Sequence, residues 1–431
     1  MFLKKGILTG TVLAAIIALT GCSSTGGSDS GKIELRYAVW DKTHMPAIES
    51  LISEYEAENP DVDVKLEQYS YLDYWTKMET AAAGGSSPDI YWMNALNINK
   101  YADNGMLVSM DEFIKEKNVD MSQYLESLSA LYNYEGVQYG IPTFWDNNIL
   151  MINTRLMKEY NIPEPKENWT WDEMIAWLED AKTKLPDDIY PFVSAASEDT
   201  QSGVFNEVAS AGGKVISDDK KTALLTSPET KEGFTKYFEL AKSDLHAPLD
   251  VTLEVGSGTL FKSERALVLQ TGSYSLLPYS DEEQSQAAGN FKLYPIPTIK
   301  EGNKSKTVIH GLGNVISANS KHPEEAFDFI NYMSSEESMK KYTESALVPQ
   351  AHKNVQAYFG EVMKEKTGID TTVMSELAEN AMPLPNSFET PKWDKAINDN
   401  MSKFMQGEVS LDKALENAQK EMQAILDKEH K

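Results

Sequence analysis

The stretch EGVQYGIPTFWDNNILMINTRL, residues 135–156, decides how the chain is expected to fold. It opens with a turn marked by Gly136, Gly140 and Pro142 and ends in an apolar strand at 149–152. Between them lie Phe144, Trp145, Asp146, Asn147 and Asn148. Two aromatic side chains beside an acid and two amides, just before a buried strand, indicate a chain that crosses a ligand cleft.

A helix is predicted shortly after this crossing, in NWTWDEMIAWLEDAK at residues 168–182. Thr170 and Glu173 have the spacing of a capping box, in which each side chain satisfies a free backbone N–H of the first turn. One face of the helix is apolar, with Trp171, Met174, Ile175, Leu178 and Ala181 at helical spacing. The crossing therefore leads directly into a packed α/β unit.

The composition of the chain limits the kinds of protein and ligand to be considered. The 431 residues suffice for about two or three domains, and 41% hydrophobic with 25% charged residues is typical of a globular chain. The formal net charge of −26 argues against nucleic acid as a partner and against docking by charge on an anionic membrane. Arginine is the usual residue for binding carboxylate or phosphate, and only Arg36, Arg155 and Arg265 are present, which favours an uncharged ligand.

The N-terminus has the pattern of an export signal. Residues 1–21 contain Lys4 and Lys5 before an apolar run at 7–19, which is too short to span a bilayer. The run ends in Leu-Thr-Gly-Cys, which matches a bacterial lipoprotein box, and Cys22 is the only cysteine of the chain. We expect a cleaved signal peptide, a lipid on Cys22 and a flexible tether at 22–31, with an uncleaved anchor as the alternative.

Candidate ligand residues follow from the positions of the expected strands. A strand at 32–40, a helix at 46–58 and a strand at 61–67 predict a β-α-β unit with parallel strands. Ligands of such sheets lie beyond the carboxyl ends of the strands. By this rule, the strand ends and the crossing together predict as ligand-binding residues Trp40, Asp41, Tyr69, Asn94, Trp145, Asp146, Asn147, Tyr274 and His310.

The order of several motifs resembles the family 1 extracellular solute-binding proteins, the sugar-binding lipoproteins that feed ABC importers. The motifs are G-x-x-Y-G-I-P at 136–142, T-W-D-E-M at 170–174, N-P-D-V at 59–62 and S-P-D-I at 87–90. Further matches are Y-A-D-N-G-M-L-V at 101–108 and the pairing of S-K-H-P-E-E-A-F-D-F-I with G-E-V-S-L-D-K-A-L near the C-terminus. The resemblance covers nearly the whole mature chain.

The resemblance implies an α/β protein with a two-lobed, periplasmic-binding-protein-like fold. Each lobe would have a mostly parallel sheet flanked by helices, with the ligand cleft between the lobes. We expect lobe 1 at 31–143 plus 291–320 and lobe 2 at 144–290 plus 321–431. The lobes would close on the ligand by hinge motion.

The function implied is that of a lipid-anchored, monomeric receptor on the extracytoplasmic face of the cell membrane. It would capture a sugar or oligosaccharide and deliver it to the permease of an ABC importer, without enzymatic activity. Flat amphipathic aromatics for the sugar faces, and amides and carboxylates for the hydroxyls, suit this ligand. The alternatives are a receptor for another small solute, such as a polyamine or a glycerol phosphodiester, an exported carbohydrate-active enzyme, and a surface adhesin.

No motif in the sequence indicates a catalytic residue, a cofactor or a metal. The six histidines do not pair at the i, i+3 or i, i+4 spacing of a zinc site. The run at 256–263 is similar to a phosphate-binding loop, but Phe261 stands where the second glycine is required.

Overall fold

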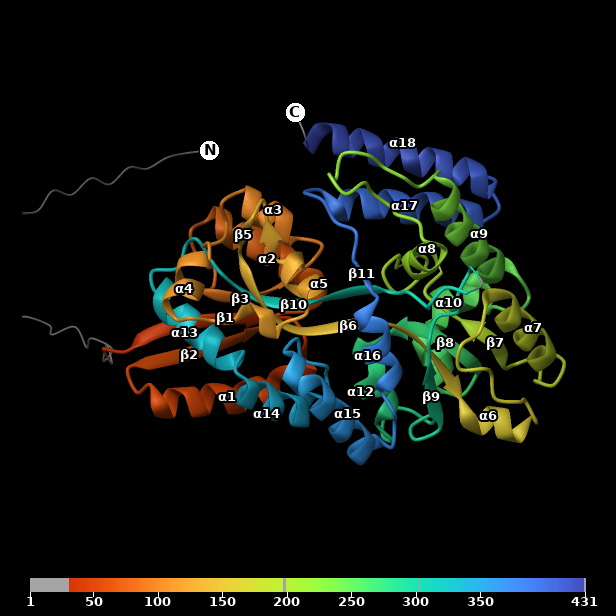
Figure 1. Cartoon of the computed structure of the whole chain (residues 1–431), viewed down its shortest axis with the longest axis horizontal. Helices are drawn as coiled ribbons and strands as arrows, with labels where there is room; N and C mark the ends of the chain where they lie inside the picture. The colour runs from red at the N-terminus through yellow and green to blue at the C-terminus, as the bar shows by residue number, and fades with distance from the viewer. Residues whose placement is uncertain (1–30, 197–198, 301, 430–431) are drawn as a thin grey trace, which may run out of the picture.

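The computed structural model describes residues 31–196, 199–300 and 302–429 (Figure 1). The expected signal peptide, Cys22 and tether residues 22–30 lie outside these ranges. In the described part of the chain, nine strands form one sheet in the order β2-β1-β3-β10-β6-β8-β7, with β11 on β10 and β9 on β6. The expected two-lobed α/β fold is confirmed, and the two lobes share this sheet.

The first lobe contains the predicted β-α-β unit. Strands β1 (Ile33–Val39) and β2 (Val62–Gln68) pair in parallel, and α1 (Met45–Glu58) connects them. β3 (Ile90–Asn94), which follows α2 (Tyr71–Ala83), pairs in parallel with the other side of β1. Figure 1 shows α1 on one side of these strands and α2 on the other. β1 and β3 therefore lie inside the sheet, whereas β2 forms its edge.

Two strands connect the lobes. β6 (Gly140–Asn153) is buried along its whole length, and its first half pairs antiparallel with β10 (Val308–Ile316). Its second half pairs with β8 (Ala266–Gly272) and β9 (Phe291–Tyr294). The close approach of β10 requires glycine, because a Cβ on Gly311 would lie 2.4 Å from the carbonyl oxygen of Phe144.

The second lobe is built on β7 (Tyr190–Val193), which pairs in parallel with β8. The predicted helix after the crossing is α7 (Trp171–Lys182), and its capping box between Thr170 and Glu173 is present. This lobe also contains α6 (Thr154–Glu159), α8 (Phe205–Ala211), α9 (Pro228–Lys242), α17 (Thr390–Met405) and α18 (Leu411–Glu429). Figure 1 shows α17 and α18 side by side at the top of this lobe.

Further elements surround these two lobes. Around the first lobe and the crossing they are η1 (Lys42–His44), α3 (Ile98–Asp103), α4 (Asp111–Glu116), η2 (Met121–Gln123), α5 (Glu126–Leu131), β4 (Asn133–Tyr134) and β5 (Val137–Gln138). Those that come later are α10 (Leu249–Val255), α11 (Ser257–Lys262), η3 (Ser273–Ser275), α12 (Leu276–Ser280), α15 (Lys353–Thr367), α16 (Thr372–Glu379) and β11 (Met382–Pro383). No helix in the described ranges is both long and apolar enough to span a bilayer.

Two segments pack differently from the expected division into lobes. β9, expected in lobe 1, pairs with the second-lobe half of β6. Helices α13 (Pro323–Met333) and α14 (Glu336–Ala346), expected in lobe 2, pack on the first lobe, where Lys341 forms an ion pair with Glu54 of α1 at 2.6 Å. The physical reason is a later crossing: the chain enters lobe 1 through β10 and returns through β11, which pairs with β10.

Candidate functional site

An acid and a histidine face each other where β6 and β10 cross. Asp146 and His310 occupy paired positions of the two strands, and Asp146 Oδ1 lies 2.5 Å from His310 Nε2. Only 12% of each side chain is exposed. Burial raises the pKa of Asp146 above its usual range, and the adjacent imidazole opposes that rise. The pair is a polar centre at the junction of the lobes.

Tyr274 of the second lobe lies beside this pair. Its ring packs over Gly272 at the end of β8, where an added Cβ would meet the ring at 2.3 Å and Asp146 Oδ1 at 3.3 Å. The residue as a whole is 50% exposed, and its hydroxyl lies 3.0 Å from Ser202 Oγ. Burial raises the pKa of Tyr274 to about 12, and the carboxylates of Asp199 and Asp146 add to the rise.

The first lobe presents an aromatic surface. The Trp40 ring lies 5.7 Å from Tyr71 and 5.6 Å from Trp75, between centroids, and Tyr71 is 48% exposed. The pKa of Tyr71 is raised by burial of its hydroxyl and by the charges of Asp199 and Asp394. Since both acids belong to the second lobe, the aromatic surface of one lobe faces the acids of the other.

Asp199 and Asp394 were missed from the sequence. Asp199 Oδ1 accepts hydrogen bonds from the backbone N–H groups of Gln201, at 2.9 Å, and Ser202, at 3.2 Å. Asp394 of α17 accepts from the hydroxyl of Thr200, and burial together with Asp199 raises the pKa of Asp394 to about 6. The sequence did contain one signal for Asp394, a repeated Trp-Asp pair at 40–41, 145–146, 171–172 and 393–394. Every pair except 171–172 places a side chain near the junction of the lobes.

We define the interlobe site by the side chains that these distances and charges bring together: Trp40, Tyr71, Asp146, Asp199, Tyr274, His310 and Asp394. Asn94 of β3 is close to it, since the side chain of Asn94 limits the rise in the pKa of Tyr71. Asn94 Oδ1 also accepts from the side-chain amide of Asn97 at 2.9 Å. Four of the nine candidates from the sequence are therefore members of this site, and Asn94 adjoins it.

Trp145 and Asn147 lie at the crossing but are buried. Trp145 is 2% exposed and its indole Nε1 donates to the carbonyl oxygen of Gln350 at 3.0 Å. The side-chain amide of Asn147 donates to the carbonyl oxygen of Met374 at 2.8 Å. Both side chains thus hold later segments of the chain onto β6.

Asp41 and Tyr69 have other neighbours. Asp41 caps η1, accepting from the backbone N–H of Thr43 at 2.8 Å. The Tyr69 hydroxyl donates to Glu67 Oε2 at 2.6 Å, and the ammonium group of Lys77 lies 4.3 Å from the Tyr69 ring. Tyr69 contributes to a groove that also includes Arg36, on the edge of the sheet away from β6. The structure therefore separates Tyr69 from the interlobe site.

The interlobe site consists of aromatic rings, carboxylates and one imidazole. In the ranges that the structure describes, no group of three or more His, Cys, Asp or Glu is arranged to hold a metal ion. Such a site offers flat apolar faces for stacking and several hydrogen-bond acceptors, a combination that recognises hydroxyl-rich or cationic small molecules.

Residues 41–340 match the family model of the bacterial extracellular solute-binding proteins. The chain belongs to this family. This confirms the resemblance found in the sequence motifs. The matched residues contain every member of the interlobe site except Trp40 and Asp394. The family is one of extracellular solute-binding proteins rather than of enzymes.

Two curated relatives align over most of this solute-binding protein. It is 26% identical to the multiple sugar-binding protein of Streptococcus mutans over 371 residues, covering 82% of this chain and 83% of that protein. It is 25% identical to the galactooligosaccharide-binding protein of Bacillus subtilis over 430 residues, covering 95% of this chain and 96% of that protein.

Among solved structures, the fold is similar to that of an ABC substrate-binding protein from Listeria monocytogenes in complex with cycloalternan. The TM-score is 0.80 at 22% identity, covering 92% of this chain and 99% of the other. This similarity establishes the two-lobed fold of the solute-binding protein.

Proposed function

We propose that this solute-binding protein captures a sugar or oligosaccharide between its lobes and delivers it to the permease of an ABC importer. The observation that carries the proposal is the pair of half-exposed tyrosines, Tyr71 and Tyr274, on opposite lobes of one carboxylate-lined site. The names of the curated relatives and the saccharide in the Listeria complex support the same class of cargo.

The chemistry of the site suits an uncharged saccharide. Tyr71 and Tyr274 would stack on the apolar faces of sugar rings, each contributing about 0.5–1.5 kcal/mol beyond the area buried. The carboxylates of Asp199 and Asp394 would accept hydrogen bonds from the hydroxyl groups. Because the charges that reach these tyrosines are carboxylates, the same field would repel phosphodiesters and acidic sugars.

The membrane attachment rests on the sequence. A lipid on Cys22 would hold the protein on the extracytoplasmic face of the membrane, and residues 23–31 would allow the lobes to stand off it. This arrangement keeps a captured solute close to the permease.

A polyamine is the second candidate cargo, and the acid pair favours it. Burial and Asp199 together raise the pKa of Asp394 to about 6, so a ligand ammonium group near these acids would offset their mutual repulsion. A saccharide instead uses the aromatic rings on both sides of the site, which a linear amine would leave without a stacking partner.

The test is a thermal-shift screen of the protein against neutral mono- and oligosaccharides, uronic-acid oligosaccharides and polyamines. A ligand that binds only the folded state stabilises it by about 2.7 kcal/mol at one hundred times its dissociation constant. We expect a saturable rise in Tm with one class of neutral saccharide and no turnover of it. A rise in Tm with polyamines alone would show that the cargo is a polyamine rather than a saccharide. Formation of a product from a saccharide would show that the protein is an enzyme.

Truncation of the two exposed tyrosines is expected to weaken binding with little effect on folding. Tyr274→Ala and Tyr71→Ala should each raise the Kd for the saccharide by about tenfold, which corresponds to about 1.4 kcal/mol of lost stacking and contact area. Isothermal titration calorimetry measures the change. Tyr69→Ala is the matched control, since its ring lies beside Glu67 and Lys77, and it should leave Kd unchanged. The opposite ranking would place the ligand in the Tyr69 groove.

A further inference from the structure

One buried amide joins the two lobes outside the interlobe site. Asn386 lies between β11, which pairs with β10, and α17 of the second lobe. It is 9% exposed, and its side chain uses both of its polar atoms. Nδ2 donates to the carbonyl oxygen of Ala95 at 3.1 Å, and Oδ1 accepts from Asn99 Nδ2 at 3.1 Å and Lys220 Nζ at 2.8 Å.

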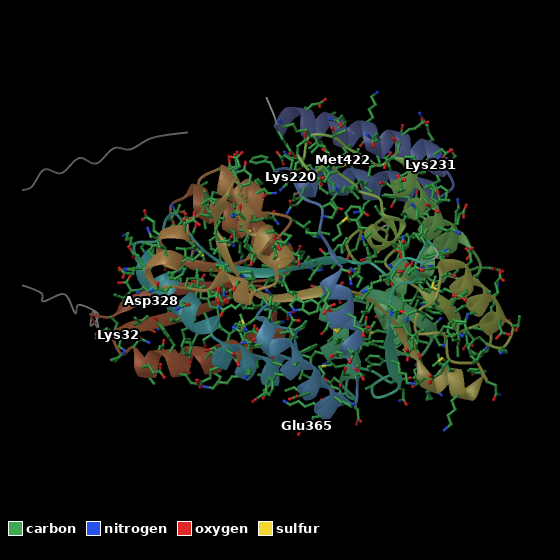
Figure 2. The ribbon with its side chains drawn as sticks, viewed as in Figure 1. Lys32, Lys220, Lys231, Asp328, Glu365 and Met422 are labelled. Atoms are coloured by element: carbon green, nitrogen blue, oxygen red, sulfur yellow. The ribbon has the colours of Figure 1, made fainter. Side chains whose placement is uncertain are left out.

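The partners of Asn386 come from opposite lobes. Ala95 directly follows β3, and Asn99 lies in the first turn of α3, both in the first lobe. Lys220 lies at the tip of a tight turn in the second lobe, in which the N–H of Lys220 donates to the carbonyl oxygen of Ser217 at 2.9 Å. Figure 2 shows Lys220 at the edge of the second lobe that faces the first.

Each side of this contact is anchored within its own lobe. The turn with Lys220 is held on α18, where Gln423 donates to the carbonyl oxygen of Lys221 at 2.9 Å and accepts from the N–H of Ala223 at 2.9 Å. On the other side, Ala95 directly follows Asn94, whose side chain limits the rise in the pKa of Tyr71 of the interlobe site. The contact at Ala95 is therefore one residue away from Asn94, which adjoins the interlobe site.

The backbone conformation of Lys220 is energetically unfavourable for a lysine. Lys220 has φ of 59°, in the left-handed region that glycine or asparagine fills more readily than a residue with a long side chain. Burial also lowers the pKa of its ammonium group, opposed by the charge of Glu429. A lysine at this position can donate a hydrogen bond from its ammonium group to Asn386, whereas a glycine has no side chain to do so.

We propose that Asn386, with Lys220, Ala95 and Asn99, forms an interlobe latch that positions the lobes in the closed arrangement and slows ligand release without touching the ligand. The inference rests on the proposed function in one respect, that the lobes open and close around a solute. Because Ala95, Asn99 and Lys220 lie outside the interlobe site, the latch would bias the closed state independently of the ligand.

The test measures the distance between the lobes without any ligand. Cys22→Ser removes the only native thiol, and spin labels at Glu112→Cys on α4 and Lys420→Cys on α18 report on opposite lobes from exposed positions. In Asn386→Ala of this full chain, pulsed electron paramagnetic resonance should show a longer and broader distance distribution. We expect about a tenfold rise in the ratio of open to closed molecules, from the loss of the hydrogen bonding by which Asn386 bridges the lobes.

A second variant separates the latch from general stability. Lys220→Gly removes the ammonium group and relieves the left-handed backbone, so its unfolding midpoint should equal or exceed that of the wild type while its lobes open. Lys214→Met is the matched control, because Lys214 pairs with Asp218 of the same lobe at 2.6 Å, and it should keep the wild-type distances.

Identical distance distributions in the wild type, Asn386→Ala and Lys220→Gly would overturn the latch. Since no ligand is present, this outcome is independent of the cargo. A failure of every saccharide in the thermal-shift screen would instead overturn the proposed function and leave the latch intact.

Discussion

Replacing Glu207 with glutamine is expected to remove several kcal/mol of pH dependence from the stability of the protein. Glu207 of α8 is fully buried, and neither carboxylate oxygen has a well-formed hydrogen bond among the described residues. Burial raises the pKa of Glu207 from 4.5 to about 8, against smaller lowering effects of its own backbone N–H and of Gln270. The wild type should therefore fold with this acid protonated at neutral pH.

The sign of the effect follows from proton linkage. Between pH 4.5 and about 8 the folded state holds a proton on Glu207 that the unfolded state has lost. The free energy of unfolding of the wild type should fall across this window by about 1.4 kcal/mol per pH unit from this group, or about 5 kcal/mol in all. Above the folded pKa, this contribution becomes constant.

In Glu207→Gln this slope disappears, because the amide does not titrate. The stability of the variant relative to the wild type should rise steadily from pH 5 to pH 8, as measured by urea unfolding at each pH. Glu239→Gln on the exposed side of α9 is the control and should run parallel to the wild type. Parallel curves for Glu207→Gln as well would mean that Glu207 finds a polar partner in solution.

Trp145→Ala is expected to destabilise the fold by about 3–5 kcal/mol, the usual cost of removing a buried tryptophan. Trp145 is 2% exposed, its indole donates to Gln350, and its backbone N–H donates to the carbonyl oxygen of Pro349 at 3.1 Å. The cavity would open where β6 passes between the lobes. Urea unfolding measures the loss, and a loss of saccharide affinity would follow from it.

The appropriate comparison is Tyr71→Ala, which removes a half-exposed ring at the interlobe site. It should lower the free energy of unfolding by less than about 1 kcal/mol, because little of the ring leaves the core. If Trp145→Ala were as stable as Tyr71→Ala and yet failed to bind a saccharide, the indole would serve the ligand directly. The sequence-based assignment of Trp145 as a ligand residue would then hold.

Local patterns predicted many elements correctly, since their causes lie within a few residues. The capping box predicted at Thr170 and Glu173 is present, and it starts α7 at Trp171. The helix predicted at 46–58 is α1, and its buried face consists of Ala47, Ile48, Leu51, Ile52 and Tyr55 at helical spacing. Each of these signals depends on residues about one helical turn apart, so it can be recognised from the sequence alone.

The rule that ligands lie beyond strand ends points to the interlobe site for the inner strands and to a different surface for the edge strand. Trp40 follows β1 and Asn94 follows β3, both inside the sheet, and both lie at or beside the interlobe site. Tyr69 follows β2, the edge strand, and so lies beside Arg36 and Glu67, away from the crossing. Strand order depends on pairing between distant segments, which periodicity does not reveal.

The sequence by itself determined the class of fold, the β-α-β unit, the helix boundaries set by caps and prolines, and the family, because each rests on local patterns and their order. Only the tertiary structure decided which polar groups meet. Asp199 and Asp394 are 195 residues apart in number, yet they share one electrostatic environment with Tyr71. Burial of Trp145 likewise depends on Gln350, far along the chain. Such contacts arise when the chain crosses between lobes, and their energy comes from desolvation and long-range pairing rather than from neighbouring residues.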